Sequence, residues 1–169
     1  MLCDVVIKII KYVLIPAKRV AVLIGHDGCV KKELEKRGVN IKIEKTGVKI
    51  SGNAISVMVA ENVVKAIGRG FSPENAFLLF DEKNLLYIRP IELEKNQLKR
   101  IKARLIGTHG KTRKRIELMT NTKISIYGKT VSIIGKPEDI KICAEAVEKL
   151  INGSPHRFVY QYLEKRCRR

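Results

Sequence analysis

The 169-residue sequence contains no Trp, and its few aromatic rings come from five Tyr and four Phe residues. Its four cysteines, Cys3, Cys29, Cys143 and Cys167, are isolated from one another, and none forms the Cys-x-x-Cys spacing of a zinc knuckle or a redox pair. This pattern excludes a cysteine-based metal site. It indicates reduced thiols that serve as small apolar residues in a cytoplasmic protein.

Long uncharged hydrophobic runs are also missing. The first apolar stretch is interrupted by Asp4, Lys8 and Lys11, so no signal peptide is apparent. No other stretch is long enough and free enough of charge to span a bilayer. We therefore expect no membrane partner.

The residue patterns of catalytic and metal-binding sites are lacking as well. The three histidines, His26, His109 and His156, are scattered, and no close pair of carboxylates belongs to a motif. A Ser/His/Asp set cannot be argued either. The sequence thus predicts no metal, no cofactor and no enzymatic activity, while a hydrophobic content of 45% is enough to build folded cores.

Acidic residues are scarce beside basic ones, and the imbalance is concentrated in one half. Residues 1–82 carry 13 basic and 9 acidic side chains, for a net charge of +4, whereas residues 83–169 carry 21 and 8, for a net charge of +13. A surface stabilised by ion-pair networks would need balancing acids. The excess favours a polyanionic partner that binds mainly to the second half.

An internal repeat with an offset of 82 residues organises the chain. The segment Leu23–Gly28 reads Leu-Ile-Gly-His-Asp-Gly, and Leu105–Gly110 reads Leu-Ile-Gly-Thr-His-Gly. Ser72-Pro73 returns as Ser154-Pro155 at the same offset. Two copies of a Gly-x-x-Gly loop in equivalent places point to a tandem nucleic-acid-binding module.

Hydrophobic periodicity and the positions of Gly and Pro predict the same series of elements in each half. The series is strand, helix, Gly-x-x-Gly loop, helix, two strands, helix and a short appended helix. In the first half the regular elements are expected at residues 5–15, 16–24, 29–37, 39–45, 48–51, 54–67 and 73–80. In the second half they are expected at residues 85–91, 95–106, 111–120, 123–127, 130–134, 137–151 and 155–166.

This order resembles the type I KH domain, an α+β fold in which a three-stranded antiparallel sheet packs on three helices. We expect two tandem domains, residues 1–82 and 83–169, each with an appended C-terminal helix. In such a domain the two loop glycines let the helix ends meet and let a nucleic-acid backbone approach closely. The following helix directs its N–H groups at phosphates, and the loop holds about four nucleotides of a single strand.

The two loops differ in the charges around them. No acidic residue lies between Lys95 and Arg115, whereas Asp27 lies between the first pair of glycines and is expected to repel phosphate, an effect that His26 offsets in part. The predicted RNA-binding residues are therefore Gly107, Thr108, His109, Gly110, Lys111, Arg113, Lys114 and Arg115, together with Lys102, Ile106 and Ile124 along the groove for the bases. The weaker first loop comprises Gly25, His26, Asp27 and Gly28.

The segment between the repeats is more specific. Residues 66–74, Ala-Ile-Gly-Arg-Gly-Phe-Ser-Pro-Glu, are similar to the inter-domain signature of the archaeal Krr/Pno family. The C-terminal Asn-Gly-Ser-Pro-His of residues 152–156, followed by Val159-Tyr160 and Leu163-Glu164, resembles the ending of the same family. Its members are relatives of the eukaryotic partner-of-Nob ribosome-assembly protein, and the resemblance covers essentially the whole chain.

The resemblance implies a non-enzymatic factor for assembly of the small ribosomal subunit and processing of the rRNA 3′ end. It implies binding of single-stranded RNA, the 3′ region of small-subunit rRNA, through the second KH domain. The protein partners it implies are the rRNA-processing endonuclease and the alpha subunit of initiation factor two. Two alternatives stay open, a general single-stranded nucleic-acid-binding module and a protein scaffold for a translation factor.

Overall fold

The computed structural model describes residues 8–44 and 47–167. It divides into two compact units, Met1–Phe80 and Asp81–Arg169, so the boundary predicted from the sequence lies two residues further along the chain. Cys3 and the first residues of the predicted strand 5–15, positions 5–7, lie outside the described residues.

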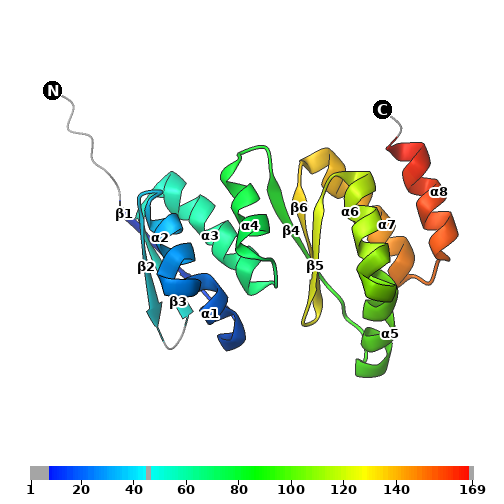
Figure 1. Cartoon of the computed structure of the whole chain (residues 1–169), viewed down its shortest axis with the longest axis horizontal. Helices are drawn as coiled ribbons and strands as arrows, with labels where there is room; N and C mark the ends of the chain where they lie inside the picture. Colours follow the sequence, from blue (N-terminus) through cyan, green and yellow to red (C-terminus); the bar gives the residue numbers. More distant parts are fainter. Residues whose placement is uncertain (1–7, 45–46, 168–169) are drawn as a thin grey trace. The chain divides into compact units, whose positions relative to one another are not determined.

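The first unit contains a three-stranded antiparallel sheet covered on one face by helices (Figure 1). Strand β3 is central, pairs with both β1 and β2, and sets Ile41 opposite Ile50. Helix α3 packs on β1 and β3, and α2 packs on β2. The elements are β1 (Lys8–Val13), α1 (Ala17–Ile24), the 3-10 turn η1 (His26–Gly28), α2 (Cys29–Glu35), β2 (Val39–Glu44), β3 (Gly47–Asn53) and α3 (Ala54–Gly68).

The second unit repeats this arrangement with the strand order β4-β6-β5. Helix α7 packs on β6, while α5 and α6 pack on β5. The elements are β4 (Leu85–Pro90), α5 (Lys95–Ile106), the 3-10 turn η3 (Thr108–Gly110), α6 (Lys111–Thr120), β5 (Lys123–Tyr127), β6 (Thr130–Gly135), α7 (Pro137–Ile151) and α8 (His156–Arg166). The predicted α+β fold, a three-stranded antiparallel sheet on three helices in each half, is confirmed.

The appended helices of the two units differ. The continuous helix predicted for residues 73–80 is a short α4 (Pro73–Ala76) followed by a 3-10 segment, η2 (Phe77–Phe80). A 3-10 turn places side chains three residues apart on the same side, and the rings of Phe77 and Phe80 accordingly stack at 5.1 Å. In contrast, α8 is a full helix whose Val159 and Leu163 are completely buried, so it belongs to the core of the second unit.

The core of the second unit determines which sides of α5 face solvent. Leu98, Ile101 and Leu105 form one buried stripe of α5, and burying each such side chain contributes about 1.5–3 kcal/mol. On one flank of this stripe lie Lys102 and Ile106, four residues apart. On the opposite flank lie two arginines, Arg100 and Arg104, so that α5 presents basic residues on two separate sides.

Candidate nucleic-acid interface

The two Gly-x-x-Gly loops have nearly the same backbone conformation. The first glycines, Gly25 and Gly107, have φ/ψ of 73°/175° and 71°/176°. At the third position Asp27 and His109 both have φ of 51°, with ψ of 25° and 29°. Asp and His are among the few non-glycine residues that tolerate this left-handed region. The backbone therefore does not distinguish one loop from the other.

Glycine is required at the first position of the loop for two reasons. Gly107 lies in a φ/ψ region that is essentially restricted to glycine. A Cβ atom there would also lie 2.2 Å from Thr112 Oγ1 and 2.9 Å from Thr112 N. The start of α6 can approach the end of α5 this closely only because no side chain intervenes.

The second glycine of the loop faces open space. Gly110 has φ of 75°, and a Cβ atom built on it meets nothing within 4 Å among the described residues. Gly110 is also the N-cap of α6, and as a glycine it has no side chain to accept a hydrogen bond from the first turn of that helix. Helix N-terminal N–H groups without an acceptor attract anions. The geometry here suits the approach of a phosphate backbone.

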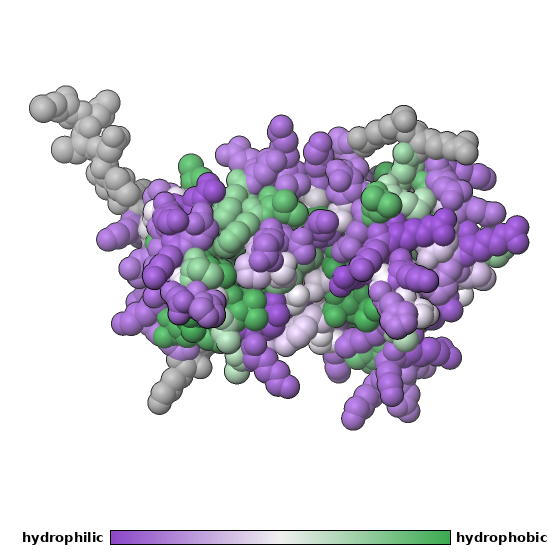
Figure 2. Space-filling view, viewed as in Figure 1, coloured by the Kyte–Doolittle hydropathy of each residue, from purple (hydrophilic) through white to green (hydrophobic). Residues whose placement is uncertain are grey.

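Exposed cations and apolar surface lie beside this loop. Lys111 and Lys114 are exposed on α6 and lie three residues apart on one side of the helix. Lys102 is half-buried on α5, and the Ile106 side chain is 38% exposed. Figure 2 shows hydrophilic residues gathered over α5 and α6, with apolar surface between these helices and β5. The loop residues Thr108 and His109 are exposed as well.

Two of the predicted cations are engaged within the second unit. Arg113 Nε lies 3.9 Å from Glu117 Oε2, while Glu117 Oε1 accepts a 2.7 Å hydrogen bond from the backbone N–H of Ile124. The first unit has the same device, in which Lys31 pairs with Glu35 at 3.7 Å and Glu35 accepts the N–H of Ile41 at 3.2 Å. Because it occurs in both units, this cation–Glu–strand link is structural and ties the second helix to the sheet.

Arg115 is held by α8. Its guanidinium lies 4.1 Å above the Tyr160 ring, and its Nη2 lies 3.6 Å from Glu164 Oε1. Tyr160 in turn donates a 3.4 Å hydrogen bond to Thr112 Oγ1. Arg115 therefore connects α6 to α8 and is less free to reach a ligand than Lys111 or Lys114.

Ile124 does not line the surface of the predicted groove. Ile124 is 4% exposed and belongs to the core cluster, because its side chain points from β5 toward the helices. Ile124 therefore lies beneath the surface of the predicted groove. Ile106 and the half-buried Ile126 supply the apolar surface there instead.

Sequence reasoning missed the contribution of α8 to this region. His156, Tyr160 and Glu164 are four residues apart in turn, so they form one stripe of α8 beside the buried stripe of Val159 and Leu163. His156 Nε2 lies 3.0 Å from the carbonyl oxygen of Arg104. Since a carbonyl only accepts, this nitrogen carries the proton. The spacing of these polar and aromatic residues was the signal in the sequence that identifies the stripe.

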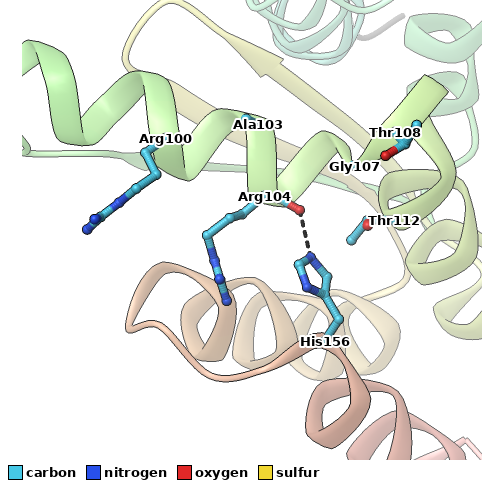
Figure 3. Close-up of a pocket in the computed structure, with 7 residues that line it drawn as sticks. All are labelled: Arg100, Ala103, Arg104, Gly107, Thr108, Thr112 and His156. Atoms are coloured by element: carbon cyan, nitrogen blue, oxygen red, sulfur yellow. Dashed lines mark hydrogen bonds between the residues drawn. The ribbon is translucent and has the colours of Figure 1, made fainter.

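A pocket of about 510 Å³ opens on the flank of α5 that faces α8 (Figure 3). The close-up shows the side chains of Arg100 and Arg104 extending from the same side of α5, and His156 reaching from α8 to the Arg104 carbonyl. The residues that line the pocket are Arg100, Ala103, Arg104, Gly107, Thr108, Thr112 and His156.

The first loop differs in its side chains. Asp27 is highly exposed, and one of its carboxylate oxygens lies 2.8 Å from Nδ1 of the equally exposed His26. On α2, Glu33 stands where the repeat places Arg115, and Cys29 stands where it places Lys111. An anionic ligand would therefore meet a carboxylate at the loop and another on the next helix.

The described residues contain no group of three or more His, Cys, Asp and Glu side chains placed to hold a metal ion. Among the same residues, no helix combines the length and the apolar character needed to cross a membrane. Burial raises the pKa of the Cys143 thiol to about 11, so this thiol stays protonated and unreactive at neutral pH.

Comparison with known families and proteins agrees with this architecture. The model of the second Pno1 KH domain, a eukaryotic-type KH domain (KH-domain type I), matches residues 83–168, and the general KH-domain model matches residues 10–66. A KH domain-containing protein of Methanocaldococcus jannaschii is 42% identical over 94% of this chain and 74% of the relative. The pre-rRNA-processing protein Pno1 of Aspergillus fumigatus is 32% identical over 80% of this chain, which spans 55% of that longer protein.

Solved structures show the same likeness. One chain of the crystal structure of an a/eIF2α–aDim2p–rRNA complex from Pyrococcus horikoshii superposes with a TM-score of 0.89 and 46% identity, over 95% of both chains. Dim2p from the same organism, solved on its own, gives a TM-score of 0.86 and 45% identity over 93% of this chain and 99% of that one. These similarities extend over both units, and the chain therefore belongs to the Pno/Dim2 family of tandem KH-domain proteins.

Proposed function

We propose that this protein binds single-stranded RNA through its second unit and acts, without catalysis of its own, in small ribosomal subunit assembly and rRNA 3′-end processing. One observation carries the proposal. Two loops with the same backbone carry different side chains. The first contains Asp27 and is followed by Glu33, whereas residues 107–115 contain no acid and include the exposed Lys111 and Lys114. The relatives support it, since Pno1 is a pre-rRNA-processing protein and the aDim2p structure is a complex with rRNA.

The proposed interface combines a clamp, cations and an apolar groove. Gly107–Gly110 lets the RNA backbone approach the N–H groups of the first turn of α6, which favour phosphate. Lys111 and Lys114 neutralise phosphates and release their counterions. Bases then pack against Ile106 and the aliphatic stem of Lys102, while Thr108 and His109 offer hydrogen-bond donors to the backbone.

Arg113 and Arg115 serve the same interface mainly by positioning. Arg113 is linked to Glu117, which fixes α6 against β5, and Arg115 is stacked on Tyr160 of α8. Their charges still add to the positive potential around the loop, because both guanidinium groups are partly exposed and their neighbouring glutamates do not neutralise them fully.

The first unit is proposed to bind RNA weakly and to contact protein. Exposed apolar residues on α3, Ile55 at 76% and Met58 at 66%, favour a protein contact there. The alpha subunit of initiation factor two is the first candidate, because a/eIF2α is present in the complex with aDim2p. The endonuclease that trims the rRNA 3′ end is the second candidate partner. We also propose that the protein acts in the cytoplasm.

The proposal is tested by fluorescence-anisotropy titration of the full chain with the 3′-terminal segment of archaeal small-subunit rRNA. A scrambled RNA and the same sequence as DNA serve as controls, each at several salt concentrations. We expect the rRNA segment to bind most tightly and its affinity to fall steeply with salt, because several phosphates are neutralised. Preference for RNA over DNA reports contacts to the 2′-hydroxyl.

Equal, weak and salt-insensitive binding to all three nucleic acids would overturn the RNA assignment and leave a protein scaffold for a translation factor as the better description. Equal, tight and salt-sensitive binding would instead indicate a general single-stranded nucleic-acid-binding module.

A further inference from the structure

We propose that the pocket between α5 and α8 is a second phosphate site, which holds the backbone of the bound RNA strand next to the Gly107–Gly110 clamp. The proposal rests on the proposed RNA-binding function of the second unit. It concerns the flank of α5 that lies opposite Lys102 and Ile106, and thus a surface outside the groove described above.

The charges of the pocket favour an anion. Arg100 and Arg104 are four residues apart, so both extend from the same side of α5 (Figure 3). Like charges at this spacing destabilise a helix unless an anion lies between them. The residues that line the pocket include no acidic side chain.

The hydrogen-bonding groups of the pocket fit a phosphate in particular. Arg104 donates from Nη2 to the backbone oxygen of Ser154 at 2.8 Å, which fixes the guanidinium in place. A guanidinium has five N–H donors arranged for oxygen anions, so one bond to Ser154 leaves capacity for a ligand. Thr108 contributes a hydroxyl at the other end of the pocket.

The first unit has different residues at the positions that line the pocket in the second unit. The repeat places Lys18, Val22, His26, Val30 and Glu74 at the positions of Arg100, Arg104, Thr108, Thr112 and His156. One of the two cations is thus replaced by an apolar side chain, and the His by an acid. The half of the chain with Asp27 in its loop therefore has fewer cationic side chains at the positions that line the pocket in the other half.

The position of the pocket identifies its ligand. Gly107 and Thr108 belong both to the clamp loop and to the wall of the pocket. A strand whose backbone passes over the loop therefore reaches the pocket with its adjoining nucleotides. RNA phosphate and free inorganic phosphate share the chemistry that the pocket recognises, and an experiment with two RNA lengths separates them.

The test measures, by fluorescence anisotropy, binding of the full chain to a tetranucleotide from the rRNA 3′ segment and to a decanucleotide that contains it centrally. Arg100 is the residue to change, because it is exposed and Arg104 has a structural bond to Ser154. We expect Arg100→Ala to weaken decanucleotide binding about 5–10-fold and to lower its salt slope by about 1, as for one lost phosphate contact. Tetranucleotide binding is expected to stay unchanged.

Lys18→Ala is the matched control, since it removes one positive charge from the equivalent exposed position of the first unit. It should leave both affinities unchanged. Loss of affinity by Arg100→Ala for both RNAs to the same extent, or for neither, overturns the pocket assignment. If the wild-type protein binds neither RNA, the proposed function itself fails, which is a separate result.

Inorganic phosphate supplies the second arm. Titration with phosphate should shift the ring resonances of His156 in the NMR spectrum of the wild-type protein and leave them in place in Arg100→Ala. If phosphate shifts these resonances while decanucleotide binding does not depend on Arg100, the pocket holds a free ion and the RNA assignment is overturned.

Discussion

Gly25–Gly28 and Gly107–Gly110 follow almost the same backbone path, yet the residues on and after them differ in charge. Residues 25–33 carry two acidic and two basic side chains, whereas residues 107–115 carry four basic and no acidic side chain. The loop geometry comes from glycine and is retained in both halves. We therefore expect that a few side chains, and not the backbone, decide which loop attracts RNA.

Reversal of the charge of the two exposed lysines after the second loop should have the largest effect on RNA binding. Lys111→Glu with Lys114→Glu should weaken RNA binding by about 100-fold, or about 2.7 kcal/mol, because two phosphate contacts become repulsive. Anisotropy titration measures the loss, and circular dichroism verifies the fold. Lys18→Glu with Lys32→Glu makes the same charge change on exposed residues of the first unit, and a comparable loss there would contradict the assignment to the second unit.

The two glycines of one loop should differ in their effect on stability. Gly107→Ala should destabilise the second unit by about 2–3 kcal/mol, because the backbone conformation is restricted to glycine and the new Cβ meets Thr112. Gly110→Ala should cost about 1 kcal/mol, since its left-handed conformation is strained but the space is open. Urea unfolding, with hydrogen exchange in α6 as the probe, measures the loss of unfolding free energy in both variants. Equal losses would refute the geometric distinction between the two glycines.

Residues of the second loop and of its following helix can be transferred to the equivalent positions of the first unit. In a protein that carries Lys111→Glu and Lys114→Glu, the further changes Asp27→His and Cys29→Lys should raise RNA affinity about tenfold, because they remove a repulsive charge and add an attractive one. The same titration measures the gain. If the affinity does not rise, features other than charge also limit RNA binding by the first loop.

An ion pair of the second unit should give the smallest difference between the units. Arg89 holds both carboxylate oxygens of Glu148, at 2.7 and 2.8 Å, and lowers the pKa of Glu148 below its usual 4.5. The pair therefore stabilises the fold above pH 4.5 and loses this effect as the pH falls through the lowered pKa. The first unit has Ile7 and Ala66 at the equivalent positions.

Thermal unfolding of wild type and Glu148→Gln between pH 7 and pH 3 tests the pair. The variant should melt slightly earlier at pH 7, and the two curves should converge as the pH falls through the lowered pKa of Glu148. A difference that stays unchanged over the whole pH range would show that the carboxylate charge is not its cause.

Most of the fold could be predicted from the sequence, because strong local signals agree. The predicted helices at 95–106, 111–120 and 137–151 have the observed bounds, since each is delimited by a loop glycine or by proline. The 3-10 segment at Phe77–Phe80 was not predicted, because nothing in the local pattern distinguishes it from another helical turn. Within the candidate site, the turn at Gly107–Gly110 and the exposed Lys111 and Lys114 follow from local sequence, whereas the burial of Ile124 and the contact between Arg115 and Tyr160 depend on tertiary packing. The binding role of these residues stays a prediction.

The left-handed conformation of the third loop residue has a consequence for how duplicated clamps can diverge. Only glycine and a few other residues, chiefly Asn, Asp and His, occupy this region readily. The charge at the third loop position can therefore change from repulsive to attractive toward phosphate through a small set of residue types, without a change in the loop backbone. Asp27 and His109 are two members of that set. A single base change in an Asp codon (GAU or GAC) gives either Asn or His.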